Sequence, residues 1–141
     1  MYKSILFPVD LDQESSWEKA LPVALALAGL DGAKIHLLTV VPDLEGMHVA
    51  AYFPPDFEQK ARHAAGERLD AFARDRMKSI AFETHVRAGT IYDEILTAAD
   101  EIGADLIVMA SHRPELADYL IGPNADRVVR HAKISVHVVR G

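Results

Sequence analysis

The chain of 141 residues contains no cysteine. Disulfide bonds and thiolate metal ligands are therefore excluded, as is usual in a reducing compartment. The histidines do not suggest a metal site either, because no two of the seven stand four residues apart, the spacing of a helical ligand pair. We expect no metal ligand, and we expect His36 and His137, which alternate with apolar neighbours, to be packed or surface side chains.

Positive charge is also scarce. The chain has 15 Lys and Arg against 21 Asp and Glu, a formal net charge of −6, and no basic cluster that could follow a nucleic-acid backbone. The longest apolar run, residues 20–30, is too short to cross a bilayer. The acidic start lacks the basic and then apolar segments of a signal peptide. We expect a cytoplasmic protein with no nucleic-acid partner and no membrane association.

Two common catalytic motifs are missing. The sequence has neither the G-x-x-x-x-G-K-[ST] phosphate loop nor the G-x-S-x-G nucleophile elbow. No side chain stands out as a general base for attack on a phosphate, so enzymatic activity stays uncertain at this point.

Short apolar runs instead alternate with helical patterns along the whole chain. We expect strands within residues 2–10, 34–41, 80–89, 104–111 and 135–140, and helices over 15–30, 56–77, 90–102 and 125–132. Runs that are apolar on both faces are typical of buried parallel strands. This β-α-β-α-β-α-β-α-β order predicts an α/β fold with a parallel sheet and right-handed crossovers, in one domain over residues 1–141.

Local signals add detail to this outline. Ser15 and Glu18 form a capping-box pattern that predicts a helix start at Ser15, with Pro22 inside the helix as a point of bending. Thr90 and Asp93 are the expected caps of a later helix, and residues 43–55 read as a loop. The expected buried faces of two helices are Phe57, Ala61, Ala64, Ala65, Leu69 and Phe72, and Ile91, Ile95, Ala98 and Ile102.

Ligands of such sheets bind beyond the carboxyl ends of the strands, so the residues that follow the strands are the candidates. Asp10 follows the first strand and either accepts hydrogen bonds from its own loop or binds a sugar hydroxyl or adenine amino group. The triplet Gly122, Pro123 and Asn124 is typical of a helix start, whose free N–H groups and dipole attract phosphate. The triplet on its own is equally explained as a helix cap.

Five segments together resemble the universal stress protein family over nearly the whole chain: "ILFPVD", "LLTVV", "RAGTIYDEIL", "GADLIVMAS" and "GPNADRVVRHAKISVHVV". A bacterial branch with "ASHRP" and "LLGSNA" is the most similar. The resemblance implies a doubly wound, five-stranded parallel sheet of order 3-2-1-4-5, like that of the adenine nucleotide alpha hydrolases. It further implies a homodimer paired through the last strand, residues 134–139, and, in one large branch, an ATP site.

The resemblance assigns a nucleotide site position by position. Adenosine is expected against the first, second and fourth strands, at Pro8, Val9, Asp10, Val40, Met109 and Ala110. The phosphates are expected between the loop that follows the fourth strand and the last helix start, at Ser111, His112, Arg113, Gly122, Pro123, Asn124 and Ala125. The implied ligand is ATP, with or without Mg²⁺, and the implied activity is at most slow ATP hydrolysis or autophosphorylation.

The phosphate loop departs from the usual pattern of the ATP-binding members. Ala110 and Arg113 stand at the first two glycine positions, and Pro123 replaces a serine or threonine. Proline supplies neither a hydroxyl nor an N–H, which predicts weakened or altered nucleotide binding. Two functions therefore stay open: a nucleotide-binding, dimeric stress or signalling protein, and a dimeric interaction module of the same fold that binds no nucleotide.

Overall fold

The computed structural model describes residues 1–43, 52–111 and 122–141. Most of the expected 43–55 loop, together with His112 and Arg113, lies outside these residues. The strands are β1 (Ser4–Pro8), β2 (Lys34–Val41), β3 (Phe82–Ala88), β4 (Leu106–Ala110) and β5 (Ser135–Val139). They form one parallel sheet in the order β3-β2-β1-β4-β5, which confirms the expected fold class and strand order.

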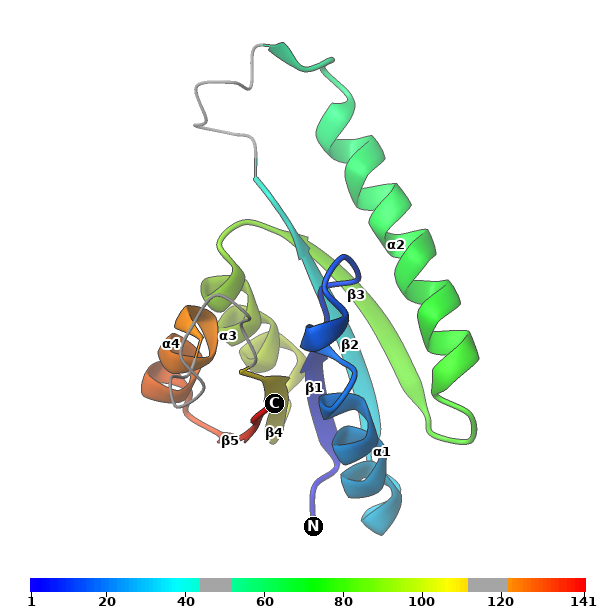
Figure 1. Ribbon diagram of the computed structural model, residues 1–141, viewed down its shortest axis with the longest axis vertical. Helices are drawn as coiled ribbons and strands as arrows, with labels where there is room; N and C mark the ends of the chain where they lie inside the picture. The colour runs from blue at the N-terminus through cyan, green and yellow to red at the C-terminus, as the bar shows by residue number, and fades with distance from the viewer. Residues whose placement is uncertain (44–51, 112–121) are drawn as a thin grey trace.

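Helices cover both faces of the sheet (Figure 1). They are α1 (Ala20–Asp31), α2 (Phe57–Arg76), α3 (Ile91–Ile102) and α4 (Pro123–His131), preceded by a short 3-10 helix, η1 (Glu14–Ser16). Helices α1 and α2 pack on one face, and α3 and α4 pack on the other. Among the described residues, no helix is long and apolar enough to cross a membrane.

The central strand β1 shows why the sequence signal was clear. Ile5, Leu6 and Phe7 are all fully buried. Ile5 and Phe7 face the core under α1 and α2, whereas Leu6 faces the core under α3 and α4. A strand covered on both faces must be apolar at every position, so it reads as a continuous apolar run.

The start of α1 differs from the prediction. The helix begins at Ala20 rather than Ser15, and no side chain caps it. The reason lies in η1, where the hydroxyl of Ser16 exchanges hydrogen bonds with the backbone of Asp10 instead of serving a helix. Pro22 consequently falls in the first turn, where its missing N–H has no intrahelical partner to lose, so no bend is required. The helix ends at Gly32, whose φ of 68° is the left-handed conformation that glycine favours.

The buried faces of two helices were only partly predicted. In α2 the buried residues are Leu69 and Ala73, while Phe57 and Ala64 are exposed. The first turns of α2 extend past the carboxyl ends of the central strands, so they have no sheet to cover (Figure 1). In α3, Ile95 and Ala98 are buried as expected and Ile102 packs at the margin of the core, but Ile91 is 42% exposed.

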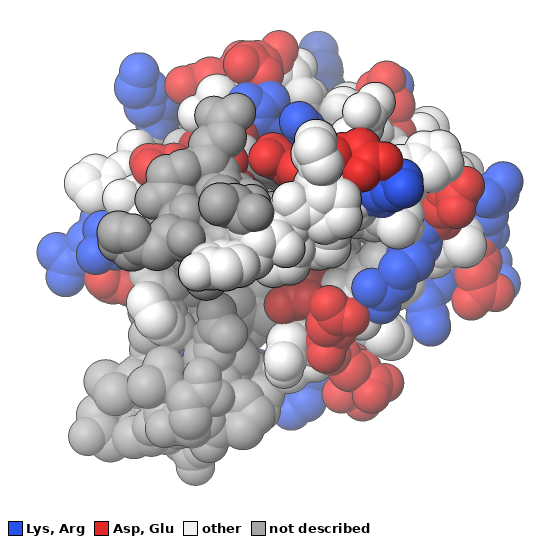
Figure 2. Space-filling view, turned by 90° about the horizontal axis from the view of Figure 1, so that it is seen from above, with Lys and Arg blue, Asp and Glu red and all other residues white. Residues whose placement is uncertain are grey.

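Figure 2 looks along the sheet onto the carboxyl ends of the strands. Lys and Arg side chains are interspersed with Asp and Glu on this face. The described part of the face therefore presents no continuous field of one sign.

Candidate functional site

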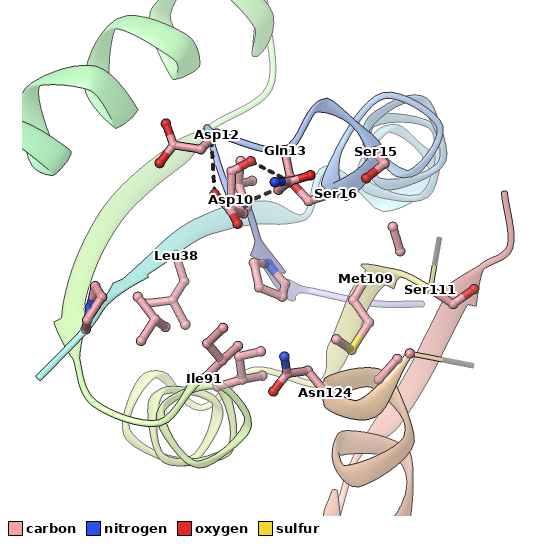
Figure 3. A pocket seen from close by; sticks show the side chains of 18 residues that line it. Asp10, Asp12, Gln13, Ser15, Ser16, Leu38, Ile91, Met109, Ser111 and Asn124 are labelled. Atoms are coloured by element: carbon pink, nitrogen blue, oxygen red, sulfur yellow. Dashed lines mark hydrogen bonds between the residues drawn. The ribbon is translucent and has the colours of Figure 1, made fainter. Parts of the chain in front are cut away.

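A cavity of about 330 Å³ opens at the carboxyl ends of β1, β2 and β4. The chain passes from β1 to β2 on one side of this point and reaches β4 on the other, so the cavity lies where the strand order reverses. This switch point is where open α/β sheets bind their ligands. The cavity is bounded by the loop after β1, by the start of α3 and by the start of α4 (Figure 3).

Nearly all the residues that the sequence assigned to a nucleotide site meet around this cavity. Those that line it are Pro8, Val9, Asp10, Val40, Met109, Ala110, Ser111, Gly122, Asn124 and Ala125. Pro123 is exposed and is not among the lining residues. His112 and Arg113 lie outside the described residues. The binding role of each residue remains a prediction, but the convergence of three strand ends and one helix start is a property of the fold.

The loop after β1 is closed by its own hydrogen bonds. The backbone N–H of Asp10 donates to Ser16 Oγ at 2.9 Å, and the Ser16 hydroxyl donates to the Asp10 carbonyl at 2.8 Å. The N–H of Gln13 also donates to that carbonyl, at 3.0 Å. Asp10 Oδ1 accepts the N–H of Asp12 at 3.0 Å (Figure 3). These four hydrogen bonds define the shape of the loop.

Asp10 has the structural role that its sequence position suggested, and its ligand-binding role remains a prediction. Oδ1 holds the loop, whereas no hydrogen bond to Oδ2 is found among the described residues, and the side chain is exposed at the cavity. One carboxylate oxygen of Asp10 thus holds the loop, and the other lies at the cavity.

Apolar side chains form the opposite walls of the cavity. Leu38 and Val40 come from β2, Ile91 and Ile95 from α3, and Met109 from β4. The sequence indicated Val40 and Met109 but missed the others. Ile91 was assigned to the buried face of α3, and its 42% exposure is explained by its position at this cavity. A flat apolar ligand would complete this wall.

The polar residues of the β1 loop were also missed. Asp12, Gln13, Ser15 and Ser16 line the cavity, because the segment forms a loop and a 3-10 turn instead of the expected helix. Asp12 is tied to α2 by Arg68, whose Nη1 lies 3.1 Å from Asp12 Oδ1. The adjacent serines Ser15 and Ser16 were the available signal, but the capping-box pattern assigns them to a helix start.

The start of α4 supplies hydrogen-bond donors. Gly122 is buried at the N-cap position, and its carbonyl accepts the N–H of Asp126 at 2.9 Å. Asn124 and Ala125 occupy the first turn, where backbone N–H groups have no intrahelical partner. The side-chain amide of Asn124 lies on the side of the cavity that Ile91 borders (Figure 3). An anion at this helix start is favoured by both the N–H groups and the helix dipole.

Comparison with known proteins places these features in a family. The model of the universal stress protein family matches residues 1–140. The chain is 38% identical over 143 residues to universal stress protein G of Shigella flexneri, covering 99% of this chain and 100% of that protein. It is likewise 38% identical over 146 residues to universal stress protein G of Salmonella typhimurium, again with 99% of this chain and 100% of that protein covered.

Solved structures agree with this placement. The universal stress protein UspA from Lactobacillus plantarum has a TM-score of 0.72 and 25% identity, with 99% of this chain and 98% of that chain covered. A universal stress protein solved in complex with cAMP has a TM-score of 0.68 and 25% identity, with 99% and 97% covered.

Proposed function

The chain belongs to the universal stress protein family, and we propose that it is a stress-response protein whose cavity binds an adenine nucleotide, with ATP as the first candidate. The observation that carries this proposal is the cavity at the carboxyl ends of β1, β2 and β4, which joins an apolar slot, a free carboxylate oxygen and a helix start. That one family member was solved with cAMP supports the same class of ligand.

The apolar slot and Asp10 suit a nucleoside. Val40, Ile91 and Met109 offer flat apolar contact to a base, and Asp10 Oδ2 can accept a hydrogen bond from a ribose hydroxyl. The cavity volume of about 330 Å³ lies at the small end of ligand pockets. A base and its ribose are therefore the part of a nucleotide that we assign to it.

The phosphates are assigned to the start of α4. The free N–H groups of Asn124 and Ala125 favour an anion there, and Arg113, outside the described residues, remains a phosphate partner proposed from sequence alone. Asp10 and Asp12 bring negative charge to the same cavity. Their carboxylate oxygens are the type of ligand that Mg²⁺ takes, so Mg²⁺ would offset the repulsion between these groups and a triphosphate.

Titration calorimetry with adenosine, AMP and ATP–Mg²⁺ tests this proposal. We expect Asp10→Asn to weaken adenosine binding about tenfold, the loss of one hydrogen bond to a charged acceptor. The asparagine keeps an oxygen for the Asp12 N–H but presents NH₂ to the ribose. Asp12→Asn is the matched control, because it removes the same charge from the same cavity and should leave adenosine affinity unchanged. Arg113→Ala should weaken ATP binding and spare adenosine.

Failure of the wild-type protein to bind any adenine nucleotide at millimolar concentration would overturn the proposal. The remaining function would then be a dimeric interaction module. Equal weakening of adenosine binding in the Asp10 and Asp12 variants would retain a nucleotide site but remove Asp10 as the ribose partner.

We also propose that the protein is a cytoplasmic homodimer, in a single domain over residues 1–141, paired through residues 134–139. Support comes from β5, which lies at one edge of the sheet and pairs only with β4 among the described residues. An open edge presents unpaired N–H and C=O groups that a second copy can satisfy.

A further inference from the structure

A cluster of two histidines and a glutamate lies on strands β2 and β3, and none of the three lines the cavity. His36 Nδ1 lies 2.9 Å from His85 Nε2 and 3.5 Å from Glu83 Oε2. The sheet register makes the cluster, since His36 pairs with Glu83 and Leu38 pairs with His85. Side chains two residues apart on a strand share a face, so all three are directed to the same side of the sheet as Leu38. One ligand atom from each residue lies within 4.8 Å of the others.

The cluster is partly shielded from water. His36 is 7% exposed, His85 is half-buried and Glu83 is exposed. Burial is the main cause that lowers the pKa of both histidines. In the contact between them one nitrogen donates and the other accepts. A metal ion bound by both rings needs a lone pair on each of these two nitrogens, and a change of tautomer in the donor ring supplies the second one.

We propose that His36, Glu83 and His85 form a binding site for a divalent transition-metal cation, with Zn²⁺ as the representative ion. Two imidazole nitrogens and one carboxylate oxygen are an established ligand set for zinc, with a water or other ligand in the fourth position. Bond lengths of 2.0–2.2 Å place tetrahedral ligand atoms about 3.3 Å apart. Two of the observed separations, 2.9 and 3.5 Å, bracket this value, and the ligand atoms of His85 and Glu83 lie within 4.8 Å of each other.

The neighbouring charges are compatible with a bound cation. Lys34 Nζ lies 2.8 Å from Glu83 Oε2 and forms an ion pair with this carboxylate. Its side chain is 44% exposed and can turn to solvent when a cation displaces it. Arg87 follows His85 on the same face, but Glu94 and Glu101 hold its guanidinium at 2.8 and 2.7 Å. Its charge is thereby balanced by two carboxylates.

The alternative is a hydrogen-bonded network of Lys34, Glu83 and the two histidines with no ligand. This network and the metal site make different predictions, because only the metal site requires both imidazoles together for Zn²⁺ binding. The site also stands independently of the nucleotide proposal, since none of its three residues lines the cavity.

Calorimetric titration of Zn²⁺ into the untagged, chelator-treated full chain tests the site. We expect saturable binding in the wild type. In His85→Gln the Zn²⁺ affinity should fall at least tenfold to a hundredfold, because losing even an outer-shell partner of a metal costs roughly this much. Glu83→Gln should reduce affinity in the same direction. The matched control is His63→Gln, which removes an exposed histidine whose Nε2 lies 3.0 Å from a single carboxylate, that of Glu67. This control should bind Zn²⁺ as the wild type does.

Proton NMR of the histidine rings in the wild type gives a second readout that does not depend on a variant that folds. Zn²⁺ should shift the ring signals of His36 and His85 before that of His63. The metal site is overturned if Zn²⁺ binds the His85 variant as tightly as the wild type. It is equally overturned if the His36 and His85 signals do not respond.

Discussion

Among single residues, Pro123 is the most informative departure from the pattern of nucleotide-binding relatives. It occupies the first position of α4, where a missing N–H costs the helix nothing. Its side chain is exposed and does not line the cavity. Proline therefore suits the helix and removes one donor from the end of the cavity where phosphates are assigned.

We predict that Pro123→Ser tightens ATP binding about tenfold, because serine adds a backbone N–H and a hydroxyl at the helix start. Calorimetry with ATP–Mg²⁺ measures the change. Adenosine serves as the internal control, since it carries no phosphate and its affinity should not move. Unchanged affinity for both ligands would mean that the first residue of α4 does not face the phosphates.

At the scale of the elements, the strands could be predicted from the sequence and their register could not. Apolar runs identify β1, β2 and β4 because both faces of each are covered. His36 and His85 are 49 residues apart, and they meet only because β2 and β3 pair in one particular register. Helical spacing in the sequence therefore gives no indication that these two histidines meet.

At the start of α1, a local sequence pattern predicted a helix start that the structure does not have. Ser15 and Glu18 satisfy a local capping pattern, but the tertiary contact of Ser16 with the end of β1 takes precedence. The loop that results carries four cavity residues that the capping pattern did not assign to a site. Site residues at strand ends could be predicted from the topology. Those on this loop could not, because their position depends on the contact between Ser16 and the end of β1.

The free edge of β5 yields a prediction for the proposed dimer. Ser111 N–H donates to the Val139 carbonyl, so Val139 faces β4. Because backbone groups alternate sides along a strand, Val138 directs its own N–H and C=O to the open edge. We expect Val138→Pro to weaken dimerisation more than about tenfold, since the edge loses a donor from each copy. Light scattering over a dilution series measures the mass.

The control for this edge is His137→Pro, which removes a donor on the β4 side and should lower the thermal midpoint instead. Proline is tolerated on an edge strand where its N–H side faces outward, so the Val138 variant should keep its fold. A monomeric wild type at micromolar concentration would contradict the dimer itself.

At the scale of the whole molecule, the cavity and the histidine cluster lie along the same sheet. The cavity opens at the carboxyl ends of β1, β2 and β4, while the histidine cluster lies on the β2–β3 side, earlier along β2. Both depend on the same strand β2. A ligand at either site binds the folded chain, so each should raise the stability of the molecule against unfolding.

The histidine cluster should also make the stability of the metal-free protein depend on pH. Burial lowers the pKa of His36 and His85 below the ordinary 6.5, although Glu83 opposes the shift and Lys34 adds to it. The unfolded chain then binds more protons than the folded chain near and below pH 6.5, so the free energy of unfolding must fall as the pH decreases through this range. Urea denaturation in chelator between pH 7.5 and 5.5 measures the slope. His85→Gln should flatten it and exposed His63→Gln should not. An equal slope in wild type and His85→Gln would show that the folded state takes up protons at His85 as readily as the unfolded chain does.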